Sequence, residues 1–515
     1  MNLNLASLVA NISLTRLFYL WVLYRIGCAL YNVSAFHPLS RFPGPKLAAL
    51  SLAYEFWFDM ILVGRYTHEI KKMHQIYGPV VRIGPNELHC SDPAFIDEIY
   101  ASGNRRRDKQ THYLNTLVGP INVGLFASRE HELHRTRRRA LNKFFSRGQI
   151  VNLEPEIHNL TQLLCNKILQ DSSKKPLDVT TAYSCFTSDL IFSYCFGESL
   201  GFLDQDGWEP NFRVAAEAIM STSYLFRFFP ALRVLPDAAP YLAKYISDSV
   251  ALLMHEMYTV MPKRILRARE ELSAGIVRKR PVVWSDIILD EKLHESQKTT
   301  VRLSGEGFSI TVAGTETTAW VLTVITFYVL SQPEIQARLT EELKGVNPSD
   351  LKWTSLEKIP YLTAVVLEGL RLAYGIGART PRIAPDEDLI YRGEMNDHTY
   401  EYVIPKGTAI GMSAVILNHN EDLFPNSEAF IPERWLNQER RREMERSLFS
   451  FNRGSRQCVG INLAYCELYL ATAALCLRVF PHMQLYQTSE EDVRYDHDKI
   501  LAQPRKGSQV RVVMK

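Results

Sequence analysis

Cys458 is the residue whose surroundings point most clearly to chemistry. Gly454 and Gly460 bracket it, so the backbone can turn tightly there and approach a flat ligand closely. A helical stretch begins at Asn462, and backbone N–H groups at the start of a helix stabilise a thiolate. A thiolate is both a nucleophile and a metal ligand, so catalysis and metal binding are the chemistry that such a cysteine permits. The alternative is a buried cysteine in a glycine-rich turn, which is the usual interpretation of a cysteine taken alone.

A second set of polar residues lies inside a long apolar stretch, Leu303 to Leu330, whose length predicts a helix that crosses the whole body. Within it, Ala313 and Gly314 precede Glu316 and Thr317. Buried polar groups cost free energy when they lack partners, so an acid and a hydroxyl in such a helix need a reason. Together they offer a route for protons. A packing notch with a solvated glutamate explains the same residues without chemistry.

The segment around Cys458 resembles the haem-binding signature of the cytochrome P-450 family, F-x-x-G-x-R-x-C-x-G. All five fixed positions match, at Phe451, Gly454, Arg456, Cys458 and Gly460. The resemblance implies that Cys458 is the axial ligand to the iron of haem b (iron protoporphyrin IX). It also implies that Arg456 pairs with a haem propionate and that Phe451 packs beside the sulfur.

The segment Ala313–Thr318 looks like the oxygen-activation motif of the same family. The resemblance implies that Thr317 is the hydroxyl beside bound dioxygen. It gives Glu316 the role of the acid in a proton relay.

Glu368 and Arg371 carry opposite charges at i and i+3 of an expected helix, a spacing that usually marks an ordinary exposed pair. Here they resemble the family's E-x-x-R, which a downstream arginine joins, in this chain Arg434 of Pro432-Glu-Arg-Trp435. The resemblance implies a buried charge network that holds the cysteine side in shape and takes no part in the chemistry.

His134 and Arg138 correspond to the family's W-x-x-x-R, whose two side chains meet a haem propionate. His134 departs from the commonest tryptophan, although an imidazole N–H can also donate a hydrogen bond. Arg379 looks like a further propionate-binding arginine, and Arg382 competes with it for that role.

Arg135, Arg139 and Lys143 recur at i, i+4 and i+8 and predict a basic helix face on the cysteine side. Such a face could dock an acidic reductase. A solvated basic surface is the simpler explanation.

The whole chain resembles the family, which implies a mainly α fold with a minor β part, in one large catalytic domain over residues 49–515. Periodicity agrees with this, because residues 129–343 are mostly helical in pattern. Short strands are expected at Val80–Cys90, Tyr400–Ile404 and Gln509–Val513.

Residues 1–34 predict an N-terminal membrane anchor. From Leu3 to Tyr31 the charges are Arg16 and Arg25, and the basic residues that follow place the catalytic domain in the cytosol. We expect a single-pass protein of the endoplasmic reticulum membrane, with Asn11 as a possible luminal glycosylation site. A cleaved signal peptide and an interfacial helix are the alternatives. Residues 35–48, rich in proline, predict a stiff, extended connector.

Composition excludes several classes. The net charge of +3, with acids and bases interspersed, does not favour nucleic acid as a partner. The eight cysteines are scattered without a C-x-x-C pair, which argues against a zinc cluster or a disulfide framework.

The resemblance implies a monooxygenase that inserts one oxygen atom from O2 into a lipophilic small molecule. Electrons would come from NADPH through a flavoprotein reductase, NADPH-cytochrome reductase. Two segments, Tyr31–Pro45 and Asp97–Tyr100, resemble the fungal secondary-metabolism branch, including trichodiene-oxygenase-like members, which points to a terpenoid or polyketide-like substrate. A haem-thiolate isomerase or dehydratase and a non-enzymatic haem-binding sensor are the alternatives, and neither needs the pair Glu316–Thr317.

Substrate contacts are expected from Arg107 to Phe126 and from Ser221 to Pro236. The second segment is apolar and could touch the membrane surface, or it could be a buried helix end.

Overall fold

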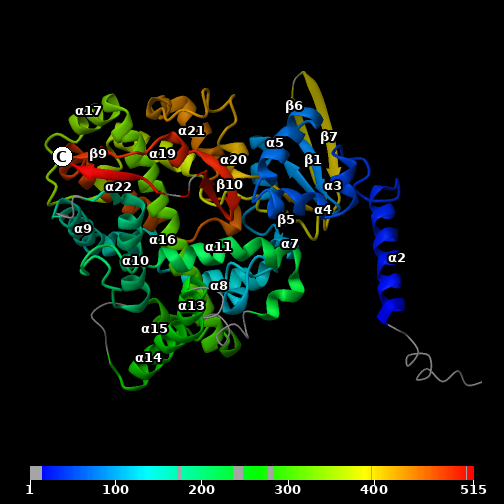
Figure 1. The fold of residues 1–515 in the computed structure, drawn as a ribbon, viewed down its shortest axis with the longest axis horizontal. Helices are drawn as coiled ribbons and strands as arrows, with labels where there is room; N and C mark the ends of the chain where they lie inside the picture. The colour runs from blue at the N-terminus through cyan, green and yellow to red at the C-terminus, as the bar shows by residue number, and fades with distance from the viewer. Residues whose placement is uncertain are drawn as a thin grey trace, which may run out of the picture.

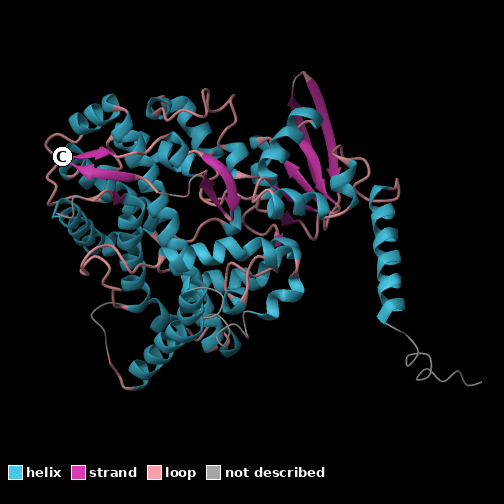
Figure 2. Cartoon of the chain, in the orientation of Figure 1, coloured by secondary structure: helices cyan, strands magenta, loops and turns pink. Residues whose placement is uncertain are grey.

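The computed structural model describes residues 14–170, 175–235, 248–276, 282–395, 397–505, 507 and 509–515. At one end of the catalytic body lie the strands β1 (Val80–Gly84) and β2 (Glu87–Cys90), the hairpin of β6 (Leu389–Met395) with β7 (His398–Ile404), and the helices α3 (Lys46–Leu50), α4 (Ala53–Phe56) and α5 (Tyr66–Tyr77). The long helices fill the other end (Figure 2). The arrangement is that of one mainly α domain with small β-sheets, as the sequence predicts.

Helix α16, Thr300–Ser331, crosses the body and is buried along most of its length. The Thr299 side chain caps it by accepting a hydrogen bond from the backbone N–H of Arg302. It packs against α10 (Val179–Phe196), α19 (Pro360–Ala373) and α22 (Ile461–Arg478). Length and composition alone would let α16 span a membrane, but 67% of its apolar window is buried in the protein. It is therefore the core helix that the sequence predicts over residues 303–330.

The remaining helices surround this core (Figure 1). The longer ones are α5 (Tyr66–Tyr77), α8 (His131–Asn142), α9 (Arg147–Gln170), α11 (Arg213–Phe228), α13 (Asp248–His255), α14 (Met261–Ser273), α15 (Val283–Leu289), α17 (Pro333–Glu342) and α21 (Gln438–Ser447). The short ones are α3 (Lys46–Leu50), α4 (Ala53–Phe56), α6 (Ile96–Ile99), α7 (Thr111–Leu114), α18 (Trp353–Leu356) and α20 (Ala414–Leu417).

A five-stranded sheet of order β1-β2-β8-β5-β3 forms the main β part. Its strands are β1 (Val80–Gly84), β2 (Glu87–Cys90), β8 (Ala409–Gly411), β5 (Arg382–Ile383) and β3 (Asp108–Lys109). Strands β2 and β8 are parallel and the other pairs antiparallel. This sheet brings Lys109 and Arg382, which are far apart in the sequence, into register opposite each other.

The other strands form smaller units. They are the hairpin β6 (Leu389–Met395) with β7 (His398–Ile404), the hairpin β10 (Tyr495–Lys499) with β11 (Leu501–Pro504), and the sheet of β4 (Leu177–Asp178), β12 (Arg511–Met514) and β9 (Met483–Leu485). The strands expected at Val80–Cys90 and Tyr400–Ile404 are present, and the C-terminal strand runs one residue beyond the expected end.

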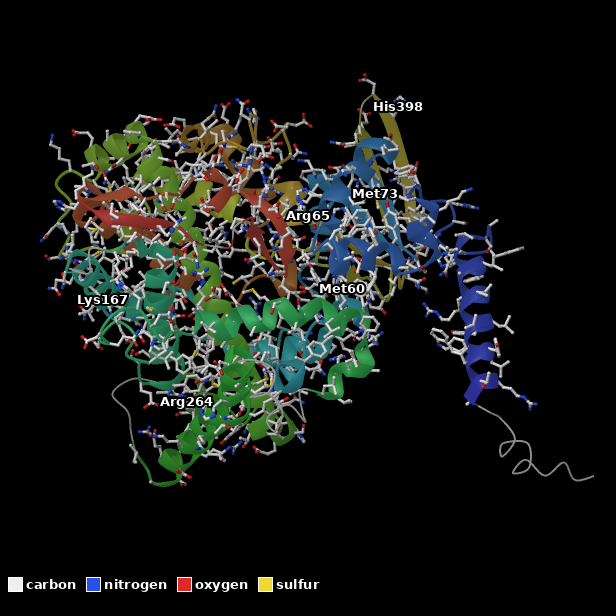
Figure 3. All side chains as sticks on the ribbon, in the orientation of Figure 1. Met60, Arg65, Met73, Lys167, Arg264 and His398 are labelled. Atoms are coloured by element: carbon white, nitrogen blue, oxygen red, sulfur yellow. The ribbon has the colours of Figure 1, made fainter. Side chains whose placement is uncertain are left out.

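Helix α2, Leu14–Val33, projects away from the catalytic body, and most of its side chains point into open space (Figure 3). Its C-terminal end contacts the body, where the Asn32 side chain donates to the Leu50 carbonyl at 3.0 Å. Phe18, Trp21 and Leu23 are each exposed by 58% or more. Exposing so many apolar side chains to water is unfavourable, so we expect the surface of α2 to be buried against a membrane or another molecule. Residues 1–13 of the expected anchor, with Asn11, lie outside the described residues.

The proline-rich connector is not extended as expected. Backbone hydrogen bonds from His37 to Ser34, Ser40 to His37 and Phe42 to Leu39 fold it into successive turns. The Phe42 side chain is buried against Tyr402 of the β6–β7 hairpin, with ring centroids 5.3 Å apart. Burial of apolar residues within the segment outweighs the extended preference of its prolines, so the folded body begins inside the connector.

Candidate active site

The loop before α22 holds Cys458 in a fixed turn. The Cys458 N–H donates to the Phe451 carbonyl at 3.0 Å. Gly454 has φ +71°, and a Cβ there would lie 1.7 Å from the Tyr100 carbonyl oxygen, so only glycine fits. Gly460 has an ordinary backbone angle and caps α22, but its Cβ would approach the Cys458 sulfur to 4.0 Å. Gly454 is therefore required by the turn, whereas at Gly460 a side chain would make only an ordinary van der Waals contact with the sulfur.

Cys458 is the exposed cysteine of the chain, whereas Cys28 is half-buried and the other six are buried. Neighbouring groups nevertheless crowd one side of the thiol, and this burial raises its pKa, with a hydrogen bond from Gly460 and the charge of Arg138 acting in the opposite direction. The helix start alone thus does not keep the sulfur ionised. Coordination to a metal would, because a metal deprotonates a coordinating thiol outright.

Helix α8 closes on this loop. Arg138 donates to the backbone carbonyl of Gln457 and, at 3.5 Å, to that of Cys458. His134, one turn earlier, is 4% exposed, and burial together with the charge of Arg456 lowers its pKa to about 2. The imidazole is therefore neutral and retains one N–H donor.

Around His134 lies a cluster of cations, which we call the cationic cluster: Lys109, Arg382 and Arg456, which are buried, and Arg138, which is half-buried. Burial lowers the pKa of each, and mutual repulsion lowers that of Lys109 and Arg456 further, to about 9 for Arg456. Asp108 is the carboxylate that offsets Arg456. Buried cations with so little counter-charge are costly, which marks this place as a site for an anionic ligand.

The cationic cluster is held in place by backbone carbonyls. Arg456 donates to those of Arg107, Ser128 and Arg129 at 2.9, 2.6 and 2.8 Å. Lys109 donates to the Phe126 carbonyl at 2.6 Å, and its ammonium lies 3.6 Å from the centre of the Phe126 ring. Sequence reasoning missed Lys109, because no local pattern marks a single lysine in a two-residue strand.

Arg379 lies in a different place. Its Nη2 and Nε atoms each lie 2.6 Å from a carboxylate oxygen, on Glu55 and Glu87 respectively. Arg227, at the end of α11, shares Glu55 at 2.9 Å. Arg379 is thus neutralised by carboxylates, whereas Arg382, the competing residue, belongs to the cationic cluster.

Glu316 and Thr317 occupy different faces of α16. Ala313 is exposed and Thr317, one turn later on the same face, is half-buried. Thr315, Glu316 and Thr318, on the other faces of the helix, are buried. The Thr317 hydroxyl donates to the Ala313 carbonyl at 2.7 Å. Ser184 of α10 donates to Glu316 at 3.2 Å. Burial raises the pKa of Glu316 to about 7, with Arg213 and Ser184 acting in the opposite direction.

A cavity reaches both residues. Its lining comes from α10, α11, α16, the end of α19 with the turn after it, and β11: Thr180, Arg213, Glu217, Met220, Glu316, Thr317, Trp320, Ala373, Gly375, Leu501, Ala502 and Gln503. The α11 residues Arg213, Glu217 and Met220 precede the expected segment Ser221–Pro236, Met220 by a single residue, and no lining residue lies in Arg107–Phe126. The charged pair Arg213–Glu217 was not singled out because i, i+4 pairs on helices are usually surface pairs.

Glu368, Arg371 and Arg434 lie in mutual contact. Glu368 and Arg371 are fully buried, with Glu368 Oε1 2.8 Å from Arg371 Nη2 and 3.1 Å from Arg434 Nε. Arg371 also donates to the carbonyls of Asn418 and Ser427. The i, i+3 pair Glu368–Arg371 is therefore buried, whereas ion pairs with this spacing are usually exposed on helices.

The basic face of α8 points outward. Arg135 is exposed and lies 3.6 Å from Glu132, Lys143 is exposed and lies 3.4 Å from Asp286, and exposed Arg139 donates to the Lys292 carbonyl.

Fold and site together define a haem-thiolate oxygenase domain. The family model described as "Cytochrome P-450" matches residues 43–512, and the chain belongs to that family. It is 40% identical over 454 residues to cytochrome P-450 monooxygenase ppzE of Metarhizium majus, covering 85% of this chain and 94% of the relative. It is 37% identical to cytochrome P-450 monooxygenase tpcC of Cochliobolus heterostrophus (92% of each chain) and 35% identical to tryptophan 6-hydroxylase fscE of Fusarium equiseti (93% of each). The protein is a cytochrome P-450 monooxygenase.

Membership in this family implies haem, and the residues fit it. The exposed thiol of Cys458 would serve as the iron ligand, and the cationic cluster would supply counter-charge for two propionates. Gly454 keeps the loop close to the Tyr100 backbone.

Proposed function

We propose that this monooxygenase inserts one oxygen atom from O2 into a lipophilic small molecule of secondary metabolism, terpenoid or polyketide-like, with electrons from NADPH through a flavoprotein reductase. The observation that carries the proposal is the acid–hydroxyl pair on α16. Thr317 opens toward the cavity, and Glu316 behind it has a pKa raised to about 7, so the carboxyl can hold or release a proton near neutral pH.

Each group has a defined task. Bound through Cys458, haem supplies the activation of dioxygen. Cys458 would hold the iron, while His134, Arg138, Arg382 and Arg456 would hold the propionates. Arg382 takes the place that was expected for Arg379, because Arg379 already has two carboxylate partners.

Glu316 would take protons from the polar groups around it and pass them to the Thr317 hydroxyl. For that step Thr317 Oγ1 must turn away from the Ala313 carbonyl that it now contacts at 2.7 Å. Glu368, Arg371 and Arg434 hold the cysteine side rigid and exchange no proton.

The rival functions fit the site less well. An isomerase or dehydratase of the haem-thiolate type, and a haem-binding sensor, need no proton relay. Neither explains a carboxyl that is buried beside a hydroxyl at the edge of the cavity, where its desolvation costs stability.

We further propose that α2 anchors the protein in the endoplasmic reticulum membrane, with the catalytic domain in the cytosol. The exposed apolar helix supports this. A second apolar surface lies on the body: Trp57, Phe229, Val234 and Leu235 are exposed by 45% or more, and Phe229 packs edge-on against Phe56. Within the expected segment Ser221–Pro236, Tyr224 and Arg227 near the end of α11 are buried and most of the residues that follow the helix are exposed, whereas Pro236 lies outside the described residues. The exposed residues support the proposed contact with the membrane surface.

The basic face of α8 (Arg135, Arg139 and Lys143) supports docking of an acidic reductase at low ionic strength.

The test is spectroscopic. The purified protein, reduced and exposed to carbon monoxide, is expected to show the red-shifted Soret band of thiolate-ligated haem, and Cys458→Ser is expected to lose it. Retention of that band in Cys458→Ser would exclude Cys458 as the ligand. NADPH consumption with a reductase and a panel of lipophilic compounds then separates turnover from binding, and a protein that binds haem but never consumes NADPH with any compound would favour the sensor.

A further inference from the structure

We propose that a second cavity, beside the loop that carries Cys458, binds a planar aromatic anion such as an aromatic carboxylate. We call it the loop cavity. It shares no lining residue with the cavity that contains Glu316 and Thr317. Its ligand would therefore be an effector and not the substrate, and the proposal goes beyond the proposed function.

The loop cavity is large enough for a small molecule and open to it. Its volume is about 380 Å³, within the range of roughly 300–1,000 Å³ that is typical of ligand sites. It lies between α18, α19, α21 and α22 and reaches the loop residues Phe451 and Gln457. The side chain of Arg147, which also lines it, is 50% exposed, so the cavity opens to the surface.

The charges of the lining do not balance. Arg147 pairs with Glu357 at 2.5 Å, and Arg441 pairs with Glu445 at 2.7 Å. The third arginine, Arg453, forms an ion pair with no carboxylate in the described part of the chain and donates instead to the backbone carbonyl of Glu445. The lining thus carries one positive charge in excess.

The acid nearest in effect does not neutralise Arg453. Burial lowers the pKa of Arg453, and the charge of Asp97 acts in the opposite direction. Asp97 is already paired with Arg446 at 2.5 Å and does not line the loop cavity. The positive charge of Arg453 therefore remains available to a ligand.

Two buried donors of the lining lack partners. They are Nε of Arg453 and Nε1 of Trp353, a residue that is 1% exposed. Among the lining residues, all of which the structure describes, no buried side-chain acceptor is left without a partner. A buried donor without a partner is costly, and a hydrogen bond to an ionised acceptor is the stronger kind. Unmatched donors beside an excess positive charge favour an anion over a neutral or cationic ligand.

Aromatic rings form much of the apolar wall. The ring centroids of Phe451 and Tyr465 lie 5.2 Å apart, and those of Tyr465 and Tyr469 lie 6.3 Å apart. Trp353 adds a fourth ring to the lining. Aromatic rings pack favourably against one another at centroid distances of about 4.5–7 Å, so these side chains suit a ligand with a ring system of its own.

The experiment compares 2-naphthoate with 2-naphthamide, its neutral analogue of similar shape, by calorimetry on the haem-loaded protein. 4-Phenylimidazole is present at saturation, because it binds haem iron through nitrogen and occupies the side of Thr317. We expect 2-naphthoate to bind about tenfold more tightly than 2-naphthamide. Equal binding of the two probes, or loss of 2-naphthoate binding when 4-phenylimidazole is added, would overturn the proposal.

The decisive variant is Arg453→Gln, which removes the excess charge. We expect it to abolish the preference for 2-naphthoate while leaving the binding of 2-naphthamide unchanged. Arg442→Gln, at an exposed arginine of α21 outside the loop cavity, is the matched control and should behave like the wild type. A preference that survives Arg453→Gln, or that Arg442→Gln also loses, would contradict the role of Arg453.

Tyr465→Ala provides a second test that leaves Arg453 in place, should Arg453→Gln not fold. It removes part of the aromatic wall, so both probes should bind about tenfold more weakly and the preference for the anion should remain. Unchanged affinities would show that the probes bind elsewhere and would refute the site. The reduced carbon monoxide spectrum reports whether each variant is loaded with haem, and loss of the red-shifted band in the wild type would refute the haem-thiolate assignment instead.

Discussion

Glu368→Gln is the substitution whose effect the structure defines best. Glu368 is fully buried, and its two oxygens accept five hydrogen bonds. Arg371 Nη2 and Nε donate at 2.8 and 2.9 Å, Arg434 Nε at 3.1 Å, Trp435 Nε1 at 2.8 Å and the Ile431 N–H at 2.8 Å. Every neighbour is a donor, so a carboxylate fits and a primary amide does not.

Glutamine preserves the size of the side chain but removes its charge and turns an NH2 group toward donors. Two guanidinium groups then lack a counter-charge in a buried place. Breaking such a pair costs about 3–5 kcal/mol, out of a total stability of about 5–15 kcal/mol for a native protein. A loss of about 3 kcal/mol raises the unfolded fraction roughly 100-fold, because about 1.4 kcal/mol corresponds to a factor of ten.

The loss should depend on pH. Burial alone would raise the pKa of Glu368, but Arg371 and Arg434 outweigh it, and the pKa lies below its ordinary value of 4.5. The stabilisation by Glu368 is therefore fully present above the pKa that this carboxyl has in the unfolded chain. It is lost as the pH falls through the lower pKa that the carboxyl has in the folded protein. Wild type and variant should differ most near neutrality and converge in acid.

Urea unfolding followed by pulse proteolysis measures the change without requiring substrate. Glu443→Gln, exposed on α21, serves as the control and should lie within about 0.5 kcal/mol of the wild type. The double variant Glu368→Gln/Arg371→Met should recover part of the loss, because it removes a stranded charge. A Glu368→Gln protein within about 1 kcal/mol of the wild type at pH 7 would show that the buried charge network does not support the fold.

Three further predictions concern the site. Arg382→Met should weaken haem retention about tenfold, measured as haem transfer to apomyoglobin, whereas Arg379→Met should lower unfolding stability with less effect on haem; the reverse pattern would assign the propionate to Arg379. The pKa of Glu316 is raised from 4.5 to about 7, so the folded state favours the neutral carboxyl. The wild type should therefore lose stability relative to Glu316→Gln as the pH rises from 5 to 8. A difference in stability that does not change with pH would contradict a buried, protonated carboxyl. Charge reversal at Arg135 and Lys143 should slow reduction by the reductase in stopped-flow experiments at low salt with unchanged haem content, and equal rates would exclude this face as the docking surface.

Local sequence determined the parts of the site that lie within one element. The turn around Cys458 is marked by Gly454, which must adopt a positive φ beside the Tyr100 carbonyl, and the long apolar stretch containing Glu316 and Thr317 predicts a helix that is buried along its length. Each signal is contained in a few consecutive residues, because backbone angle and periodicity are local properties. The buried ion pair Glu368–Arg371 was reached by family resemblance, since its spacing alone favours a surface pair.

Only the tertiary structure determined which charged side chains lie next to each other. Arg379 and Arg382 are three residues apart, yet one pairs with Glu55 and Glu87 and the other lies opposite Lys109 in the sheet. Their partners come from segments about 300 residues away, and no local pattern encodes such contacts. Glu217 is a second example. Its i, i+4 pairing with Arg213 is typical of a surface pair, and only the packing of α11 against α16 places both residues at the cavity. The sequence by itself predicted Cys458 as the iron ligand and the chemistry that such a ligand would permit, because the motif around Cys458 is local. The electrostatics of the haem site and of the substrate cavity were decided only by the fold, because burial and long-range contacts set them.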